Sequence, residues 1–548
     1  MDTKVTPAGP GWHAPFDWHR GYPTPRTPVF ARNVVATSQP LAAQAGLHIL
    51  RSGGNAIDAT IAAAATIAMT EPVSNGLGSD AFAIVWDGQQ LHGLNASGVA
   101  PAAWDKAYFN KRHGEAIPLR GVDTVTVPGA VAGWAALHEK FGRLPMADIL
   151  APAIELAEKG YAVAPMVQRK WANQIGELDT QPGFAEVFMP RGRAPLIGER
   201  ITMPGAAATL KRLAQYGARE YYEGQTGEQL AAYIQQHGGS LTAADLAAYQ
   251  PEWSGTISRH YRGYDVHEIP PNGQGIAALM AMGMLEKFDV AGLDPDSVQN
   301  RHLQIEAMKA AFADVYKYVG DPRSMTRVTA DDLLDDAYLA SRAALIDPNK
   351  ATDFGPGDPP RGGTIYLTAA DDNGMMVSFI QSNYMGFGSG VVAPELGISC
   401  QNRGQGFSLK DGSPNLVAPG MRPFHTIIPG FLMRDGKPQM SFGVMGGNMQ
   451  PQGHMQTVSR MVDHGQNPQA ACDAPRWKVN RGLALDVEDS MERDVVNSLR
   501  QMGHQIERAV DSYMDFGSGQ FIWRLSDDKD DGYVAASDSR RDGHAAGF

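Results

Sequence analysis

Cysteine is nearly absent from this chain: only Cys400 and Cys472 occur among 548 residues. Two cysteines are too few for the disulfide framework of a small secreted protein. Positive charge is also scarce, because 47 lysines and arginines stand against 59 acidic residues and leave a net charge of −12. No basic stripe is available to displace counterions from a nucleic acid, so we expect no nucleic-acid partner.

Long apolar runs are missing as well. The longest stretch of small apolar residues, 56–69, carries Asp58 and is shorter than the roughly 20 apolar residues that a membrane-spanning helix needs. Residues 1–26 contain no apolar segment behind basic residues, so the sequence shows no export signal there. We therefore expect a cytoplasmic protein with no membrane partner.

Several catalytic and cofactor signatures are also absent. The sequence contains no HExxH, CxxC, P-loop or GxSxG pattern. The run Gly404-Gln405-Gly406 lacks the third glycine and the βαβ setting of a dinucleotide-binding site. The sequence therefore predicts neither a metal site nor a cofactor.

The chain divides into a helix-rich first part and a hairpin-rich second part. Helices are predicted in four segments, at residues 40–51, 56–70, 129–260 (mostly helical) and 301–319. Hairpins are predicted where turn residues separate apolar runs, at residues 81–96, 364–381, 425–445 and 520–537. Without internal repeats, this order predicts an α/β (α+β) body in which two antiparallel sheets pack together under helices.

Residues 346–363 interrupt this pattern with four prolines and four glycines. Such a composition disfavours both helix and strand, and it is typical of an exposed loop where chains are cut. Thr364 follows at once, at the start of a predicted strand. A simple connector is the alternative interpretation.

Thr364 could become a nucleophile only if a base lies beside it, because a free hydroxyl is weakly nucleophilic. A break between Gly363 and Thr364 would supply that base as a new α-amino group, whose ordinary pKa is about 7.7–8.0. Gly363 has no Cβ, so the hydroxyl could approach the preceding carbonyl. A Gly-Thr pair at a strand start is common, however, and does not by itself indicate catalysis.

Gly446 and Gly447 lie between a predicted strand and a helix predicted at residues 448–463. Unpaired backbone N–H groups and the helix dipole favour negative charge at such a junction. These groups could hold the oxyanion of a tetrahedral intermediate. A tight structural turn explains the two glycines equally well at this point.

Eight stretches, in the same order, resemble the γ-glutamyltranspeptidase family, and the resemblance extends from about residue 34 to residue 548. They are SGGNAIDATIAAA (52–64), EAMKAAFADVYKYVGDP (306–322), GGTIYLTAADDNG (362–374), GFGSGVV (386–392), MRPFHTIIP (421–429), GVMGGNMQPQGHMQ (443–456), DAPRW (473–477) and ASDSRRDG (536–543).

The resemblance implies a four-layer αββα sandwich of the N-terminal-nucleophile hydrolase type. It also implies autocatalytic cleavage into a large subunit, residues 1–363, and a small subunit, residues 364–548, which stay together. Thr364 falls on the family's nucleophile, Ser382 on a threonine that supports it, and Gly446 and Gly447 on its oxyanion-hole glycines. Whether two such heterodimers pair further is left open.

The glutamate-binding residues of the family are not matched. Ser97 stands at the place of an arginine that binds the α-carboxylate, and Gly406 at the place of an aspartate that binds the α-ammonium group. His425 and Thr426 replace a pair of serines, and Tyr384 replaces an asparagine. The loss of both charged partners removes charge-assisted hydrogen bonds that are individually strong.

Arg403 and His425 are then the candidates to bind a different acidic group, with a structural ion pair as the alternative for Arg403. The segment 408–421 is too short for the lid found in several family members. We therefore expect an open cleft in which hydrolysis outruns transfer to an acceptor. No role is assigned to Asp80 or His454.

This pattern is similar to the branch that includes glutathione-hydrolase-like proteins, oxamate amidohydrolases and class IV cephalosporin acylases. We expect an amidohydrolase that acts on a small-molecule amide with a non-glutamyl or small acidic acyl group. Hydrolysis or transfer of γ-glutamyl compounds, glutathione included, is the first alternative. A non-catalytic binding or structural protein with the same fold is the second.

Overall fold

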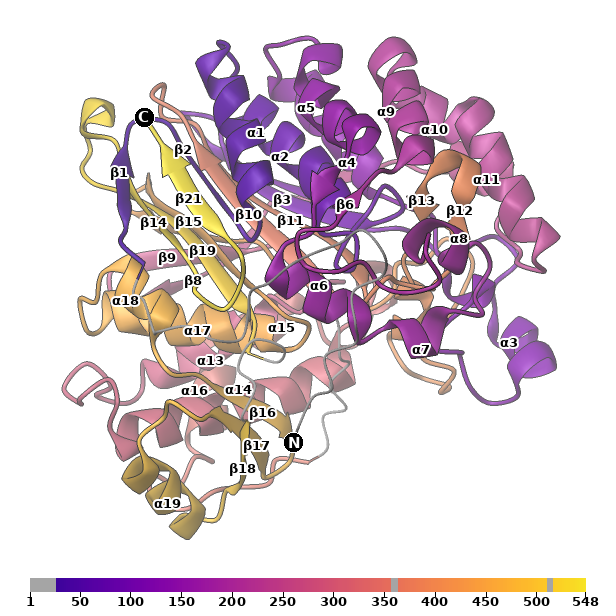
Figure 1. Cartoon of the computed structure of the whole chain (residues 1–548). Coiled ribbons are helices and arrows are strands. Elements are labelled where there is room, and N and C mark those ends of the chain that lie inside the picture. Colours follow the sequence, from indigo (N-terminus) through magenta and orange to yellow (C-terminus); the bar gives the residue numbers. More distant parts are fainter. Residues whose placement is uncertain (1–25, 356–362, 510–515) are drawn as a thin grey trace.

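The computed structural model describes residues 26–355, 363–509 and 516–548. At its centre lie two mainly antiparallel sheets of seven strands each (Figure 1). The first has the order β21 (His544–Gly547), β2 (Val34–Thr37), β10 (Gly363–Ala370), β11 (Met376–Tyr384), β3 (Asp80–Trp86), β4 (Leu91–Ala96) and β7 (Glu252–Trp253). The second has the order β1 (Val29–Ala31), β20 (Tyr533–Ser537), β19 (Ser518–Arg524), β15 (Lys437–Met445), β14 (Gly430–Arg434), β9 (Tyr264–Glu268) and β8 (Ile257–Tyr261).

The two sheets face each other across a buried apolar layer. Successive side chains of a strand point to opposite faces, and β3 shows the result. Its Phe82 and Ile84 enter the layer between the sheets, where they join Ile380 of β11 and Phe431 of β14. The intervening small residues, such as Ala83, pack on the outer face against helices.

Helices cover both outer faces. The first sheet is covered by α1 (Pro40–Arg51), α2 (Ala56–Thr70) and α4 (Ala130–Phe141), and α5 (Met146–Lys159) packs on α2. The second is covered by α13 (Ile276–Leu285), α17 (Met449–Val462) and α18 (Pro468–Asp473), and α14 (Val298–Tyr318) packs on α13. Every residue of the alanine-rich α2 is buried, which small side chains permit because backbones can then approach closely. The four layers expected from the sequence are confirmed.

Shorter elements surround these layers. The other helices are α3 (Lys106–His113), α6 (Pro165–Ala172), α7 (Ile175–Leu178), α8 (Phe184–Phe188), α9 (Pro204–Tyr216), α10 (Arg219–Glu223), α11 (Gln225–Gln236), α12 (Ala243–Ala248), α15 (Ala330–Leu334) and α16 (Asp336–Ala343). Two small two-stranded sheets pair β5 (Tyr161–Ala162) with β6 (Arg200–Ile201) and β12 (Val392–Ala393) with β13 (Ile398–Ser399). Among the helices that the structure describes, none combines the length and apolar character of a bilayer-spanning segment.

Three parts of the sequence-based description were wrong. The helical region predicted up to residue 260 ends earlier, because β8 begins at Ile257 and pairs with β9 at the sheet edge. The hairpin predicted from residue 425 begins at Gly430, since residues 425–429 form no strand ladder and lead into β14. The strand that closes the chain, β21, was missed: its HAAG sequence has weak strand propensity, and its pairing with β2 is a tertiary effect.

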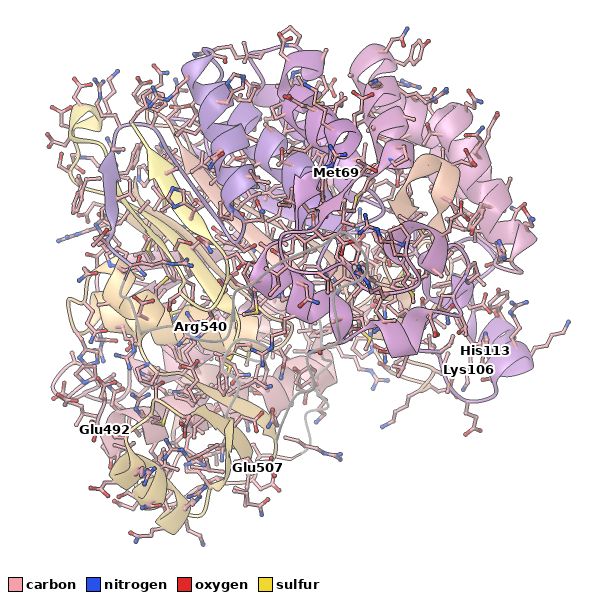
Figure 2. The ribbon with its side chains drawn as sticks, viewed as in Figure 1. Met69, Lys106, His113, Glu492, Glu507 and Arg540 are labelled. Carbon is pink, nitrogen blue, oxygen red and sulfur yellow. The ribbon has the colours of Figure 1, made fainter. Side chains whose placement is uncertain are left out.

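A small lobe below the second sheet was also missed. It consists of β16 (Trp477–Arg481), β17 (Ala484–Glu488), β18 (Gln505–Ala509) and α19 (Arg493–Gln501). Figure 2 shows Glu492 and Glu507 on this lobe, whereas Arg540 lies between the lobe and the sheets.

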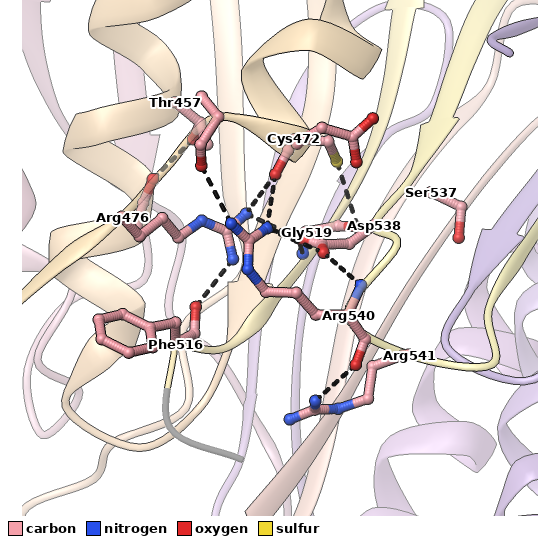
Figure 3. A network of polar contacts seen from close by, with 12 residues as sticks. Thr457, Cys472, Arg476, Phe516, Gly519, Ser537, Asp538, Arg540 and Arg541 are labelled. Atoms are coloured by element: carbon pink, nitrogen blue, oxygen red, sulfur yellow. Dashed lines mark hydrogen bonds and ion pairs between the residues drawn. The ribbon is translucent and has the colours of Figure 1, made fainter. Parts of the chain in front are cut away.

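Arg540 belongs to a buried ionic network that joins the lobe to the second sheet (Figure 3). Asp538 accepts hydrogen bonds from Arg476 Nη2 at 2.7 Å and from the Gly519 N–H at 2.8 Å, and Arg540 Nη1 lies 3.1 Å from its other oxygen. Arg540 Nη2 also donates to Glu488 on β17 at 2.6 Å. Burial raises the pKa of Asp538, but the two guanidinium groups outweigh it and hold that pKa well below its usual range.

Candidate active site

Thr364 lies at the beginning of β10, where the pairing with β11 is irregular. Gly363 pairs with Tyr384 and Ile365 with Gln381, so both Ser382 and Asn383 fall opposite the single residue Thr364. Irregularities of this kind re-aim side chains and are frequent at active sites. Thr364 Oγ1 lies 3.2 Å from Ser382 Oγ, and Thr364 is only 2% exposed in the continuous chain.

Ser382 is held from two further directions. The backbone N–H of Tyr384, whose φ of +77° is in the left-handed region, donates to Ser382 Oγ at 2.8 Å. Arg403 Nη2 lies 3.5 Å from the same oxygen. With two donors directed at it, the Ser382 hydroxyl is best placed to donate its own proton toward Thr364. The role of Ser382 as a support for Thr364 stays a prediction.

Arg403 is fully buried and lies behind Ser382. Its Nη1 donates to Thr426 Oγ1 at 3.0 Å, and its guanidinium carbon lies 4.3 Å from the centre of the Tyr384 ring. Its Nε lies 3.5 Å from Asp80 Oδ2. Burial lowers the pKa of Arg403 to about 10, against the opposing effect of Asp80 and Tyr384. The group therefore carries a positive charge near Ser382 and Thr364 at neutral pH.

His425 lies on the other side of the same carboxylate. Its Nε2 lies 3.1 Å from Asp80 Oδ2, and its Nδ1 accepts the Ile427 N–H at 3.4 Å. A backbone N–H can only donate, so Nδ1 must be the acceptor and Nε2 carries the proton. Burial and the charge of Arg403 lower the pKa of His425 to about 4. His425 is thus neutral at pH 7 and orients Asp80, which leaves Arg403 as the positively charged group.

Asp80 is the centre of this arrangement. It opposes Ser382 in the ladder between β3 and β11, and its Oδ1 accepts the Gly98 N–H at 2.8 Å. The sequence analysis assigned it no role, although the neighbouring glycine loop marked the segment. Ser97, the residue before Gly98, donates its hydroxyl to Asn95 at 2.7 Å and is fully buried. Ser97 therefore lies beside the cluster, with its hydroxyl already bound within the protein.

Gly446 and Gly447 connect β15 to α17 in conformations that favour glycine, with φ values of +127° and +58°. No residue that the structure describes accepts a hydrogen bond from either backbone N–H. The Gly447 carbonyl accepts from the Gln450 N–H at 3.3 Å and from Gln274 Nε2 at 2.9 Å. Two backbone donors are therefore available at a helix N-terminus, as an oxyanion hole requires.

The sequence motifs and this geometry agree with a comparison to known proteins, in which the model of the γ-glutamyltranspeptidase family matches residues 42–548. The chain belongs to the γ-glutamyltranspeptidase family.

Full-length family members support this assignment. The chain is 36% identical to the oxamate amidohydrolase proenzyme of Klebsiella pneumoniae subsp. pneumoniae, over 93% of this chain and 97% of that protein. It is 34% identical to the glutathione hydrolase-like YwrD proenzyme of Bacillus subtilis, over 94% and 98%. The crystal structure of cephalosporin acylase from Bacillus halodurans shares 46% identity, with a TM-score of 0.92 over 98% of this chain and 99% of that one. The chain is therefore an amidohydrolase with the N-terminal-nucleophile hydrolase fold.

Gln450 is a site residue that the sequence analysis missed. It lies in the first turn of α17 and is fully buried, and its Nε2 is 3.5 Å from Thr364 Oγ1. Its Oε1 accepts the Ile428 N–H at 2.9 Å. The available signal was the run of buried amides in QPQGHMQ, which is unusual for a helix that flanks a sheet.

His454, on the same helix, is fully buried against the second sheet. Its Nδ1 is 2.6 Å from Glu268 Oε1 on β9, and its ring packs against Phe442. Burial raises the pKa of Glu268, and the attraction of His454 only partly offsets this. A histidine in the core of the second sheet accounts for these contacts.

One cluster in the described part of the chain has the composition of a metal site: His302, Glu306 and His504. The Lys309 ammonium group, 2.5 Å from Glu306 Oε1, already supplies a positive charge there. His302 Nε2 is within hydrogen-bond distance of the Asp347 carbonyl (2.8 Å), and Glu306 accepts the Thr352 N–H at 2.9 Å. We interpret the cluster as an anchor for residues 347–352 rather than as a metal site of this family member.

Proposed function

We propose that this family member is a proenzyme that cuts itself between Gly363 and Thr364 and then uses Thr364 as a threonine nucleophile. The observation that carries the proposal is the contact between Thr364 Oγ1 and Ser382 Oγ at the irregular start of β10. Residues 1–363 would form the large subunit and residues 364–548 the small one.

The first reaction is an N→O acyl shift. Thr364 Oγ1 attacks the Gly363 carbonyl carbon, the Gly363–Thr364 C–N bond breaks, and the hydroxyl proton passes to the Thr364 nitrogen. Water then hydrolyses the ester, which releases the Gly363 carboxylate and restores the Thr364 hydroxyl. The new α-amine can act as a base at neutral pH, because its ordinary pKa is about 7.7–8.0.

The mature reaction repeats this chemistry on a substrate amide. The α-amine of Thr364 takes the hydroxyl proton while Oγ1 attacks the carbonyl carbon. The N–H groups of Gly446 and Gly447 stabilise the oxyanion; the loss of one such donor typically costs about 2.7–4 kcal/mol. The protonated amine of Thr364 returns its proton to the leaving nitrogen, and water then releases the acyl group.

We assign the acyl group to a small acidic class. The buried charge of Arg403 lies behind Ser382, and Arg403, Thr426 and Tyr384 form one contacting set. A guanidinium fork suits a carboxylate, and relatives of this chain include an oxamate amidohydrolase and a cephalosporin acylase. In the structure, the Asp80 carboxylate balances the positive charge of Arg403. An acidic substrate would therefore share the Arg403 guanidinium group with Asp80.

A γ-glutamyl substrate is the second candidate, because several relatives are glutathione hydrolases, including one from Bacillus subtilis at 30% identity. Against it, the Ser97 hydroxyl is bound to Asn95 and Gly406 offers no charge. A non-catalytic protein of the same fold is disfavoured, because the nucleophile, its supporting hydroxyl and the glycine pair are all present.

Denaturing mass spectrometry tests the proposal. The purified protein should show two chains that separate at residues 363 and 364, whereas Thr364→Ala should remain one chain. The processed protein should release the acyl group of oxamate or glutaryl-p-nitroanilide faster than that of γ-glutamyl-p-nitroanilide. An active preparation that consists of a single uncut chain contradicts the proposal. Faster release from the γ-glutamyl probe would favour the second candidate.

A further inference from the structure

We infer that Gln450 is a catalytic residue: its side-chain amide donates a hydrogen bond to the nucleophilic oxygen of Thr364. The inference rests on the proposed function, because it gives Gln450 a part in the same reaction. Neither residue type nor motif marked Gln450 as functional, and the geometry alone identifies it.

The orientation of the Gln450 amide is fixed by its surroundings. The backbone N–H of Ile428 points to one end of the side-chain amide at 2.9 Å. Only an oxygen can accept there, so the other end, 3.5 Å from Thr364 Oγ1, is the NH2 group. Because Gln450 is fully buried, water does not compete strongly for this donor.

The position of Gln450 also links two parts of the site. Its backbone N–H donates to the Gly447 carbonyl, so the glycine pair and the side-chain donor belong to one rigid turn of α17. A site built on a helix holds its groups more precisely than one built on a loop. The nucleophile and the oxyanion-hole glycines are thereby kept in a fixed relation across the two sheets.

Two donors therefore converge on Thr364 Oγ1, Ser382 Oγ at 3.2 Å and Gln450 Nε2 at 3.5 Å. With both directed at the oxygen, the hydroxyl proton of Thr364 is free to pass to the nitrogen of the same residue. The donors stabilise Oγ1 whenever it gains negative charge, in the attack on a carbonyl and again when it leaves the acyl group. No other proton or co-reactant is needed.

Self-cleavage provides a readout that needs no substrate, because the same oxygen attacks the Gly363 carbonyl. The full-length precursor would be made by cell-free translation, and the loss of the uncut chain followed on denaturing gels between about pH 5 and pH 9. The test variants are Gln450→Met, which removes the donor at similar volume, and Gln450→Glu, which keeps an acceptor for Ile428. Gln452→Met is the matched control, since Gln452 is equally buried on α17 but, among the described residues, its side chain bonds only to the backbone of Asn448 and Val479.

We expect Gln450→Met to slow cleavage by about tenfold to a hundredfold at every pH, a smaller loss than for a short oxyanion-hole bond because the contact is long. Gln450→Glu should be slow at neutral pH, where a carboxylate repels the charge forming on Oγ1, and should recover as the pH falls and the carboxyl group can donate. Gln452→Met should cleave at the wild-type rate. A buried carboxylate also destabilises the fold when it ionises, so the comparison uses only pH values at which Gln450→Glu keeps the wild-type circular dichroism spectrum. Within that range, a purely structural role would not change the cleavage rate with pH.

Three outcomes would overturn the inference: wild-type cleavage rates in Gln450→Met, equal slowing in Gln452→Met, or a Gln450→Glu profile that parallels the wild type. If Gln450→Met fails to fold, the Gln450→Glu pH profile decides alone, because its recovery at low pH is measured within one protein. A wild-type chain that is never cut at residue 363 contradicts the proposed function instead, so the two failures are distinguishable.

Discussion

Asp80 and His425 form a contact of 3.1 Å that is wholly buried, between β3 and the segment that leads into β14. The carboxylate also faces Arg403, so one acidic group holds a neutral histidine and a cation in place beside Ser382, which contacts Thr364. The stability and the specificity of the site should both depend on this arrangement.

Asp80→Asn should therefore destabilise the protein strongly. The substitution leaves the Arg403 guanidinium buried without its carboxylate, and breaking a buried pair in this way typically costs about 3–5 kcal/mol. Urea unfolding of the uncut Thr364→Ala chain measures the change. Asp87→Asn on the turn after β3 is the control, since the Asp87 carboxylate is partly exposed and pairs with His92. Equal free energies of unfolding for the two variants would show that Asp80 does not stabilise its contacts with Arg403 and His425.

Stability should decrease as the pH falls below about 6.5. Burial and then the charge of Arg403 lower the folded-state pKa of His425 to about 4. Burial and then the charge of Lys309 lower the folded-state pKa of His504 to about 3. Below about pH 6.5 the unfolded chain binds protons at these histidines that the folded chain does not, so each removes about 1.4 kcal/mol per pH unit until its folded pKa is reached. Urea midpoints at several pH values should show this slope, and His504→Gln should reduce it. A urea midpoint that stays constant from about pH 6.5 to about pH 4 would contradict the lowered pKa values.

Arg403→Lys should weaken the binding of an acidic acyl group more than that of an uncharged one. Lysine keeps a charge but cannot reach Thr426 and Ser382 together, as the guanidinium fork does. We expect KM for glutaryl-p-nitroanilide to rise about tenfold, a loss of about 1.4 kcal/mol, with a smaller change for butyryl-p-nitroanilide. Arg422→Lys, at a partly exposed arginine that pairs with Glu252, should change neither. An equal rise in KM for both substrates would show that Arg403 has only a structural role.

Asp538→Asn should destabilise the junction between the small lobe and the second sheet. The change leaves Arg476 and Arg540 buried with one carboxylate fewer, again at a cost of about 3–5 kcal/mol. Asp530→Asn breaks only the exposed pair with Arg32 and should cost about 1 kcal/mol or less. Thermal unfolding of the two variants makes the comparison, and near-identical curves would refute a structural role for the network.

The sequence predicted those features that depend on local patterns or on family motifs. The helices at residues 40–51 and 56–70 coincide with α1 and α2. Helical spacing and the following Gly53-Gly54 mark the first, and its run of alanines marks the second. Ser382 beside Thr364 followed from the family motif, and the structure places the two hydroxyls together.

The remainder depends on contacts between distant segments. For Gln450 the run of amides in QPQGHMQ is the only local signal, since its position at the site comes from contacts with Thr364 on β10 and with the Ile428 N–H. Asp80 follows a glycine loop, and the sequence assigned it no role. Its contacts come from Arg403 and His425, which are distant in sequence. Strand β21 forms because it pairs with β2 at the edge of the sheet, and its own composition does not indicate a strand.

Both central sheets draw strands from either side of residue 363. β10 and β11 lie between β2 and β3 in the first sheet, and β14 lies between β9 and β15 in the second. A chain cut before Thr364 would thus consist of two interwoven fragments, and neither fragment would contain all the strands of a sheet. Scission would turn a unimolecular folding reaction into a bimolecular one, so the enzyme should assemble once, before the cut, and should not regain activity after denaturation and dilution.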